Sequence, residues 1–297
     1  MKKTPLQIVN YYLAKVYYDI YLQISTFFKK PPVIVYQMGR VGSKTVEASL
    51  KEMLSGVPVH HVHWLTKEGL ESYERRTRSI YKSHPGKHFW VGQHLRKQIG
   101  ERQNRRKWNL VTLVRDPIAR NISAFFHTLD LWYPNFNTQY SDQQQSILFK
   151  ELVNIFLENF PHEIPLIWLD SEMRQVFGMD VFRSEFPIFK GYMIYHENMT
   201  TLLLIRLEDL NRRASEAFSN FLEIEGFSLV KANVSCQAEY GHIYRKFLET
   251  VNLPESYVDF MYSSKYARHF YTEEEIESFR NRWLRTDLDK RTKNSSI

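Results

Sequence analysis

Seven consecutive residues near the start of the chain combine a flexible backbone with positive charge. They are Arg40, Val41, Gly42, Ser43, Lys44, Thr45 and Val46. Gly39 and Gly42 permit a tight turn and the close approach of a ligand to the backbone. A helix that begins after this turn presents unpaired N–H groups and the positive end of its dipole, which bind phosphate or sulfate. Because Arg40 and Lys44 add charge, the segment predicts an anion-binding loop.

The spacing within this loop differs from that of nucleoside triphosphatases. Their loop has four residues between its first glycine and the Gly-Lys-Ser/Thr end. Here only Arg40 and Val41 separate Gly39 from Gly42, and a serine stands between Gly42 and Lys44. The pattern therefore fails for a kinase, and a plain turn that joins a strand to a helix is the structural alternative.

A second polar motif follows the apolar segment 110–114. Asp116 is a typical N-cap, and the proline after it occupies the favoured first position of a helix. Arg115 and Ser123 are then able to converge on one phosphate at the carboxyl edge of a sheet. The plain alternative is an ordinary helix start with an ion pair between Asp116 and Arg120.

A histidine beside such a loop can act as a general base, which contributes about 10²- to 10⁴-fold in rate. His94 follows segment 89–93, which the pattern predicts to be a strand, so we expect it at the same sheet edge as the two motifs. The alternative is a histidine bonded to a loop carbonyl.

Three further histidines, His60, His61 and His63, raise the question of a metal site. Successive strand residues point to opposite faces, so at most His61 and His63 share one. Two imidazoles without a nearby Asp, Glu or Cys make a poor zinc site. We therefore expect no bound metal, and His63 is a second candidate for the base.

The composition bounds the fold and the partners. With 297 residues, of which 43% are hydrophobic, the chain can bury a full core as one domain. A net charge of +7 favours an anionic partner. The single cysteine, Cys236, excludes an intrachain disulfide and a cysteine-based zinc cluster. No signal peptide is recognisable, and we expect a cytoplasmic protein.

The hydrophobic pattern alternates between strands and helices. Strands are expected at 33–37, 57–63, 89–93, 110–114 and 202–207, and helices at 43–54 and 272–284. This alternation predicts an α/β domain over residues 31–290, with a central parallel sheet covered by helices on both faces. Region 125–195 is rich in aromatic residues and mostly helical, so we interpret it as an insertion within that domain.

Residues 1–30 are predicted to form an N-terminal amphipathic helix, with apolar side chains three and four positions apart between 6 and 28. Lys15, Asp19 and Gln23 interrupt the apolar run, which argues against a bilayer span. Lysines on both flanks suit a helix that lies at a membrane surface. We favour packing on the domain core, with peripheral membrane contact as the alternative.

Together the two polar motifs resemble the family of sulfotransferases that use 3′-phosphoadenosine 5′-phosphosulfate (PAPS). Residues 39–46 look like the family's 5′-phosphosulfate loop, and Arg115 with Ser123 looks like its 3′-phosphate motif. Residues 204–210 are similar to a later strand of the family. The chain most resembles the bacterial branch labelled capsular polysaccharide synthesis proteins, in which the tail 262–271 also fits.

The resemblance implies a P-loop-type three-layer α/β/α fold and PAPS as the co-substrate. It further implies in-line sulfuryl transfer to a hydroxyl of a glycan or polysaccharide, with His94 as the base. Arg40 and Lys44 would stabilise the charge that grows on the leaving phosphate, and no metal is required. The Arg-Lys-Gly loop of small-molecule sulfotransferases is missing, and Lys44 stands where many members have Thr or Ser. Residues 263–268 offer substitutes for the missing 3′-phosphate contacts: Ser263, Lys265 and Arg268.

Two other classes of function stay open. One is a kinase or phosphotransferase that uses ATP and Mg²⁺, and the other is a non-catalytic nucleotide-binding scaffold at a membrane. Basic residues flank His94, which favours an anionic nucleotide or an acidic glycan as partner. Aromatic side chains of the insertion are able to stack on sugar rings, although core packing explains them equally well. Nucleic acid is not expected, because these aromatics do not alternate with basic residues on one face.

Overall fold

The computed structural model describes residues 5–26, 30–81, 86–102, 106–133, 142–230 and 241–285. Cys236 and parts of the predicted segments 1–30 and 125–195 lie outside these ranges. The chain forms two compact units. The first comprises Met1–Val114 and Ile167–Ala232, and the second comprises Arg115–Leu166 and Asn233–Ile297.

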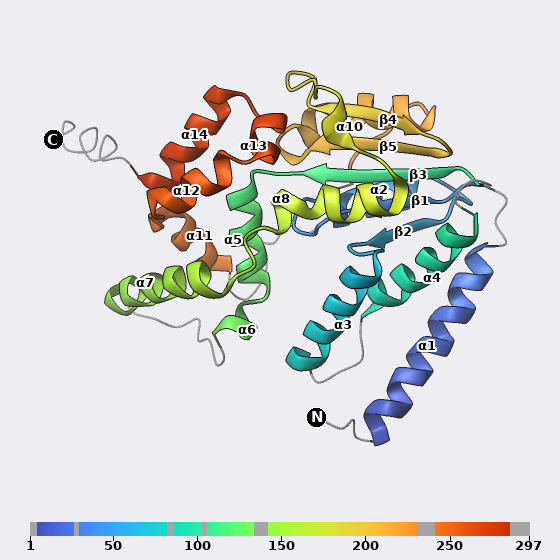
Figure 1. Ribbon diagram of the computed structural model, residues 1–297, viewed down its shortest axis with the longest axis horizontal. Helices are drawn as coiled ribbons and strands as arrows, with labels where there is room; N and C mark the ends of the chain where they lie inside the picture. Colours follow the sequence, from blue (N-terminus) through green and yellow to red (C-terminus); the bar gives the residue numbers. More distant parts are fainter. Residues whose placement is uncertain are drawn as a thin grey trace. The chain divides into compact units, whose positions relative to one another are not determined.

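The first unit contains a five-stranded, mostly parallel sheet (Figure 1). Its strands are β1 (Val33–Tyr36), β2 (Val59–Val62), β3 (Trp108–Val114), β4 (Tyr192–Glu197) and β5 (Thr200–Arg206). They lie in the order β2-β1-β3-β5-β4, and β4 alone pairs antiparallel with its neighbour. The strands β1, β3 and β5 are buried along almost their whole length, which explains their nearly continuous apolar sequences. The prediction of a mixed α/β fold is thus confirmed.

The strands that precede the two polar motifs are neighbours. Val35 of β1 pairs with Val111 of β3 on one side and with His61 of β2 on the other, all in parallel register. Parallel strands present their carboxyl ends at one edge of the sheet, where ligands bind in open α/β folds. The loop after β1 and the last residues of β3 therefore lie at the same edge.

Helical segments cover both faces of this sheet. The helical segments of the first unit are α1 (Pro5–Thr26), α2 (Ser43–Met53), α3 (Lys67–Tyr81), α4 (Lys87–Arg102), η1 (Leu169–Arg174), α9 (Gln175–Phe177), η2 (Val181–Arg183) and α10 (Leu207–Leu222), and α8 (Ile164–Trp168) leads into them. The ring of Tyr36 packs against Trp168 and Phe177 on one face. His61, on the opposite face, contacts Glu47 of α2.

The strand expected at 89–93 is wrong, because these residues belong to α4. Val91, Leu95 and Ile99 are buried at a spacing of four, which is the pattern of a helix packed on one side. The short apolar run 89–91 does not by itself distinguish a strand from a buried helix. His94 consequently lies in the middle of a helix and not at the end of a strand.

The structure contains one strand that was not predicted. The edge strand β4 falls at the end of region 125–195, which was predicted to be mostly helical. Several of its side chains are exposed or half-buried, so it lacks the continuous apolar run that identified β1, β3 and β5.

The helix α1 packs on α4 through aromatic side chains. Tyr11 and Tyr18 place their rings 5.0 and 6.5 Å from that of Trp90. Leu22 is fully buried, whereas seven other apolar or aromatic side chains of the helix are exposed: Ile8, Val9, Tyr12, Leu13, Val16, Tyr17 and Ile20. Among the described residues, none of the helices combines the length and hydropathy that a membrane crossing requires.

The second unit is helical in its described part. It contains α5 (Pro117–His127), α6 (Leu129–Trp132), α7 (Asp142–Asn159), α11 (Gly241–Thr250), α12 (Glu255–Tyr262), α13 (Lys265–Phe270) and α14 (Glu273–Leu284). Stacked and edge-on aromatic rings form its core, with Phe125 and Phe156 at 5.4 Å and Phe126 and Phe247 at 4.9 Å. The predicted capping of α14 is confirmed, because Thr272 and Glu275 form a reciprocal capping box.

Candidate functional site

The loop after β1 requires its glycines. Gly39, Arg40 and Gly42 all have positive φ, at 82°, 64° and 90°. A Cβ on Gly42 would lie 2.7 Å from Cδ1 of Leu207, so a larger residue there would require Leu207 to move in addition to adopting a positive φ. Arg40 adopts the same left-handed region, which is uncommon for a residue with a side chain. This strained turn brings the chain directly into α2.

The start of α2 is open to an anion. Gly42 occupies the N-cap position and provides no side-chain hydrogen bond to the first turn. The first N–H groups of a helix need partners from outside it. Lys44 is exposed at this end, whereas Val41 and Val46 are fully buried and anchor the loop in the core. The backbone of the loop and the Lys44 ammonium are thus the groups that suit a phosphate or sulfate.

The second motif is held by hydrogen bonds within the second unit. Asp116 caps α5, because its Oδ1 accepts from the N–H groups of Ile118 (2.9 Å) and Ala119 (3.3 Å). Tyr262 donates to the same oxygen at 2.8 Å. Burial raises the pKa of Asp116, and the Tyr262 hydrogen bond opposes that shift. The predicted cap is confirmed, and the tail around residue 262 is part of its structure.

The proposed 3′-phosphate residues flank this cap. Arg115 directly follows β3, and the hydroxyl of Tyr266 bonds both its N–H and its carbonyl. Ser123 lies two turns into α5 and is 5% exposed. The loop at 39–46 belongs to the first unit and these two residues belong to the second.

The third segment of the resemblance forms a buried ion pair. Arg206 ends β5, and its Nε lies 2.5 Å from Oδ2 of Asp209 in the first turn of α10. Both side chains are buried. Asp209 also lies against Gly191, where a Cβ would approach it to 2.5 Å. These contacts join β4, β5 and α10, so the segment has a structural explanation.

Of the predicted histidines, His63 lies against the loop at Gly39. A Cβ built on Gly39 would be 3.5 Å from Cε1 of His63, and His63 Nδ1 donates to the carbonyl of Gln37 at 2.8 Å. His94 accepts a hydrogen bond at Nε2 from the Gln98 side chain, at 2.9 Å. Burial lowers the pKa of His94, and the charge of Asp19 on α1 opposes this shift.

Two buried polar residues near β1 were not predicted from the sequence. Gln37, the residue after β1, is fully buried, and neither its Oε1 nor its Nε2 has a hydrogen-bond partner within the described residues. Unpaired buried amides are rare, and a ligand or water usually satisfies them. The amide of Gln37 therefore has hydrogen-bonding capacity that the described residues leave unused.

The other residue is Glu172, which lies in the π-helical turn η1. Its carboxylate accepts hydrogen bonds from the hydroxyls of Tyr36 and Thr66 and from the N–H groups of Leu65 (2.7 Å) and Thr66 (3.0 Å). Burial and this carboxylate raise the pKa of Tyr36, which keeps its hydroxyl protonated. The network joins β1 to the loop before α3. Because Glu172 lies more than 100 positions from its partners in the sequence, no local pattern predicts the network.

A groove of about 510 Å³ lies between α3 and α4. It is lined by Lys67, Leu70, Glu71, Glu74, Phe89, Gln93, Arg96, Lys97 and Gly100. None of these residues belongs to the loop at 39–46, and the lining includes both acidic and basic side chains. Three aromatic side chains of the insertion, Phe125, Phe126 and Trp168, have at most 1% exposure, which supports core packing over sugar stacking for these three.

A family model described as "putative capsular polysaccharide synthesis protein" matches residues 142–272. The match covers less than half of the chain and includes Glu172 and the tail with Tyr262 and Tyr266. It does not extend to the loop at 39–46. The match is consistent with a role related to polysaccharide synthesis. No curated protein and no solved structure matches the chain.

Proposed function

We propose that the chain is a sulfotransferase that moves the sulfuryl group of PAPS to a hydroxyl of a glycan or polysaccharide. The observation that carries the proposal is the glycine turn at 39–42, which opens directly onto the uncapped start of α2. A helix start of this kind favours a doubly charged oxyanion over a neutral ligand. The resemblance of the two polar motifs to the PAPS family, in order and spacing, supplies the choice of nucleotide.

Each end of the nucleotide has its own candidate residues. The 5′-phosphosulfate is assigned to Arg40, Ser43, Lys44 and Thr45 together with the backbone of Val41, Gly42 and Val46. Arg115 and Ser123 are assigned to the 3′-phosphate. In the reaction the acceptor oxygen bonds to sulfur while the bond from sulfur to the bridging phosphate oxygen breaks. Lys44 and Arg40 would stabilise the negative charge that this oxygen gains.

The acceptor hydroxyl must also lose its proton. His94 was expected to take it from the end of a strand, and its position within α4 removes that argument. His63 lies against the loop itself. We therefore favour a position beside His63 for the acceptor hydroxyl when it loses its proton. Replacement of each histidine by alanine, with the transfer rate and the nucleotide affinity both measured, separates the two candidates.

Calorimetry with 3′-phosphoadenosine 5′-phosphate, compared with ATP plus Mg²⁺, tests the nucleotide. Lys44→Ala should weaken binding of the former about tenfold or more, since a hydrogen bond to a charged group contributes about 1.5–3 kcal/mol. Lys51→Ala removes the same charge from the other end of α2, beside Glu47, and should leave the affinity unchanged. A preference for ATP and Mg²⁺ would overturn the proposal in favour of a kinase.

Transfer of labelled sulfate from PAPS to a panel of capsular and other acidic or neutral polysaccharides tests the reaction. Tight nucleotide binding without transfer to any member of the panel would contradict an enzymatic role and support a nucleotide-binding scaffold. Transfer that Lys44→Ala abolishes, while Lys51→Ala retains it, would support the assignment of the loop.

A further inference from the structure

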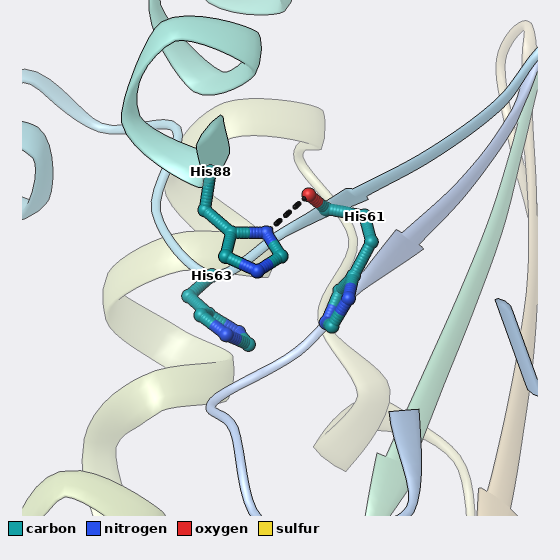
Figure 2. A group of neighbouring side chains, drawn as sticks. All are labelled: His61, His63 and His88. Carbon is teal, nitrogen blue, oxygen red and sulfur yellow. Dashed lines mark hydrogen bonds between the residues drawn. The ribbon is translucent and has the colours of Figure 1, made fainter. Parts of the chain in front are cut away.

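Three histidines of the first unit direct their rings at one another. His61 belongs to β2, His63 follows the end of that strand, and His88 lies in the first turn of α4 (Figure 2). The ring centroids are 4.5–4.8 Å apart in all three pairs. One ring nitrogen of each residue lies within 4.8 Å of those of the other two. His61 is buried, and His63 and His88 are half-buried.

The Nδ1 atom of every ring is already occupied. His61 Nδ1 donates to the Glu47 carboxylate at 3.0 Å, and His63 Nδ1 donates to the Gln37 carbonyl at 2.8 Å. His88 Nδ1 donates to the carbonyl of His61 at 2.8 Å, the bond drawn in Figure 2. Because each acceptor is an oxygen, each Nδ1 carries the proton in the neutral ring. The lone pair of a neutral ring then lies on Nε2.

This pattern is the one that metal-binding histidines show. A histidine ligand almost always donates its other N–H to a carboxylate or a backbone carbonyl, which fixes the ring and its tautomer. Here one carboxylate and two carbonyls do so. If the three imidazoles only filled space, there would be no need for all three to donate a hydrogen bond from Nδ1 to an oxygen.

A second, independent observation is the unsatisfied nitrogen of His61. Its side chain is 4% exposed, and Nε2 has no hydrogen-bond partner within the described part of the chain. A buried lone pair without a partner is unfavourable, and buried polar atoms are nearly always satisfied. A cation between the rings would provide the missing partner.

We propose that His61, His63 and His88 bind a divalent transition metal, with zinc as the first candidate. Imidazole nitrogen suits Zn²⁺, Cu²⁺ or Ni²⁺, whereas Ca²⁺ and Mg²⁺ require oxygen ligands. Zinc bonds to nitrogen at about 2.0–2.1 Å. Tetrahedral geometry at that bond length places the nitrogens about 3.3 Å apart, so binding would draw the rings together by small side-chain rotations.

Three protein ligands leave one position of a tetrahedral ion for water or substrate, as in catalytic zinc sites. His63 lies against Gly39 of the glycine loop, so an ion held by the three rings would lie near the loop. The inference stands on the geometry of the three rings and does not depend on PAPS. If the proposed sulfotransferase activity is also correct, His63 would be a ligand and not the base, and a hydroxide held by the ion would be the group able to accept the proton.

The expectation of no metal rested on His61 and His63 alone. The third histidine, His88, precedes the run 89–93, which was predicted to be a strand. The structure places that run in α4, and the start of α4 carries His88 to the other two rings.

The test is calorimetry with Zn²⁺ on the full chain after removal of metal with a chelator, together with the metal content of the untreated protein by mass spectrometry. We expect one tight equivalent of Zn²⁺. Co²⁺ in its place should give the intense visible absorption of a four-coordinate site. His88→Ala should weaken binding at least 100-fold, and Glu47→Gln should weaken it about 10- to 100-fold, as is typical for a partner of a ligand.

His60→Ala is the matched control. It removes the neighbouring imidazole, which points to the opposite face of β2, and should retain the bound equivalent. Circular dichroism shows whether each variant is folded, and His88→Gln provides a second, less disruptive variant. Absence of a tight equivalent in the unaltered chain, or equal binding by His88→Ala and His60→Ala, would overturn the proposal. Binding of 3′-phosphoadenosine 5′-phosphate is measured separately, so failure of the nucleotide assignment leaves this result intact.

Discussion

The hydroxyl of Tyr266 bridges the two backbone polar groups of Arg115, accepting from its N–H at 3.0 Å and donating to its carbonyl at 2.9 Å. Four residues earlier, Tyr262 donates to the Asp116 cap and accepts from the Trp283 indole at 2.9 Å. Two tyrosines, spaced one helical turn apart in the sequence, therefore fix the polar motif at the start of α5. The tail 262–271 is therefore part of the hydrogen-bonded structure of that motif.

Tyr266→Phe should destabilise the protein by about 1–3 kcal/mol. The substitution removes one hydroxyl and with it the hydrogen bonds to the N–H and the carbonyl of Arg115. Removal of one partner of a buried hydrogen bond destabilises a protein more than removal of both partners. Urea unfolding measures the loss. If Arg115 also binds the 3′-phosphate, the affinity for 3′-phosphoadenosine 5′-phosphate should fall as well. Unchanged stability would show that the bridge contributes nothing.

Tyr195→Phe is the matched substitution with the opposite expectation. The Tyr195 hydroxyl on β4 is buried and has no hydrogen-bond partner among the described residues, and burial raises its pKa. Removal of an unsatisfied buried hydroxyl should leave the free energy of unfolding unchanged or raise it by about 1 kcal/mol. The same urea titration checks it. A loss comparable to that of Tyr266→Phe would contradict the distinction between the two hydroxyls.

The parts of the fold that the sequence predicted are those with a strong local pattern. The strands β1, β3 and β5 have nearly unbroken apolar runs because helices cover both faces of the sheet. The caps at Asp116 and Thr272 were predictable because an N-cap depends on neighbouring residues only.

What the sequence did not predict depends on contacts between distant residues. Glu172 contacts Tyr36 and Thr66, and His88 lies beside His61 and His63, all of them distant in the sequence. The strand β4 is an edge strand with exposed positions, and α4 begins with a short apolar run that fits a strand equally well. The binding of an anion by residues 40–46 stays a prediction, which the nucleotide experiments test.

Gly42→Ala should destabilise the protein more than an ordinary glycine substitution. Positive φ costs a residue with a Cβ about 1–2 kcal/mol, and here the Cβ would also lie 2.7 Å from the Leu207 side chain. Gly56→Ala is the control, because Gly56 has φ +72° and nothing within 4 Å of the added Cβ. We expect Gly42→Ala to lose more stability than Gly56→Ala in urea and to lose nucleotide binding. Equal losses would mean that Leu207 gives way freely.

Glu172→Gln should cost about 3 kcal/mol or more. Four donors converge on the carboxylate, and an amide would place its own N–H₂ against some of them. Glu71→Gln, an exposed substitution on α3, should change stability by less than about 0.5 kcal/mol. Thermal and urea unfolding of both variants provide the comparison. A small loss for Glu172→Gln would show that the network tolerates a neutral acceptor.

The stability of the protein should fall on acidification, in part because of His162. Its Nε2 donates to the Phe156 carbonyl (2.8 Å), so its Nδ1 accepts from the Tyr257 hydroxyl (2.9 Å), and both bonds belong to the neutral ring. Burial lowers the pKa of His162 below its ordinary value of 6.5. Between the lowered pKa and 6.5 the unfolded chain binds a proton that the folded chain does not, so the free energy of unfolding decreases as the pH falls through this window.

His162→Gln removes this difference in proton uptake. The variant is expected to be less stable at neutral pH, because it loses the ring contacts, but its stability should decline less between pH 7 and pH 5 than that of the unaltered protein. Urea midpoints measured at intervals across this range give the two slopes. Between pH 7.5 and 8.5, where the histidine is neutral in both states, the two curves should run parallel. Equal slopes below pH 6.5 would exclude His162 as a source of the acid sensitivity.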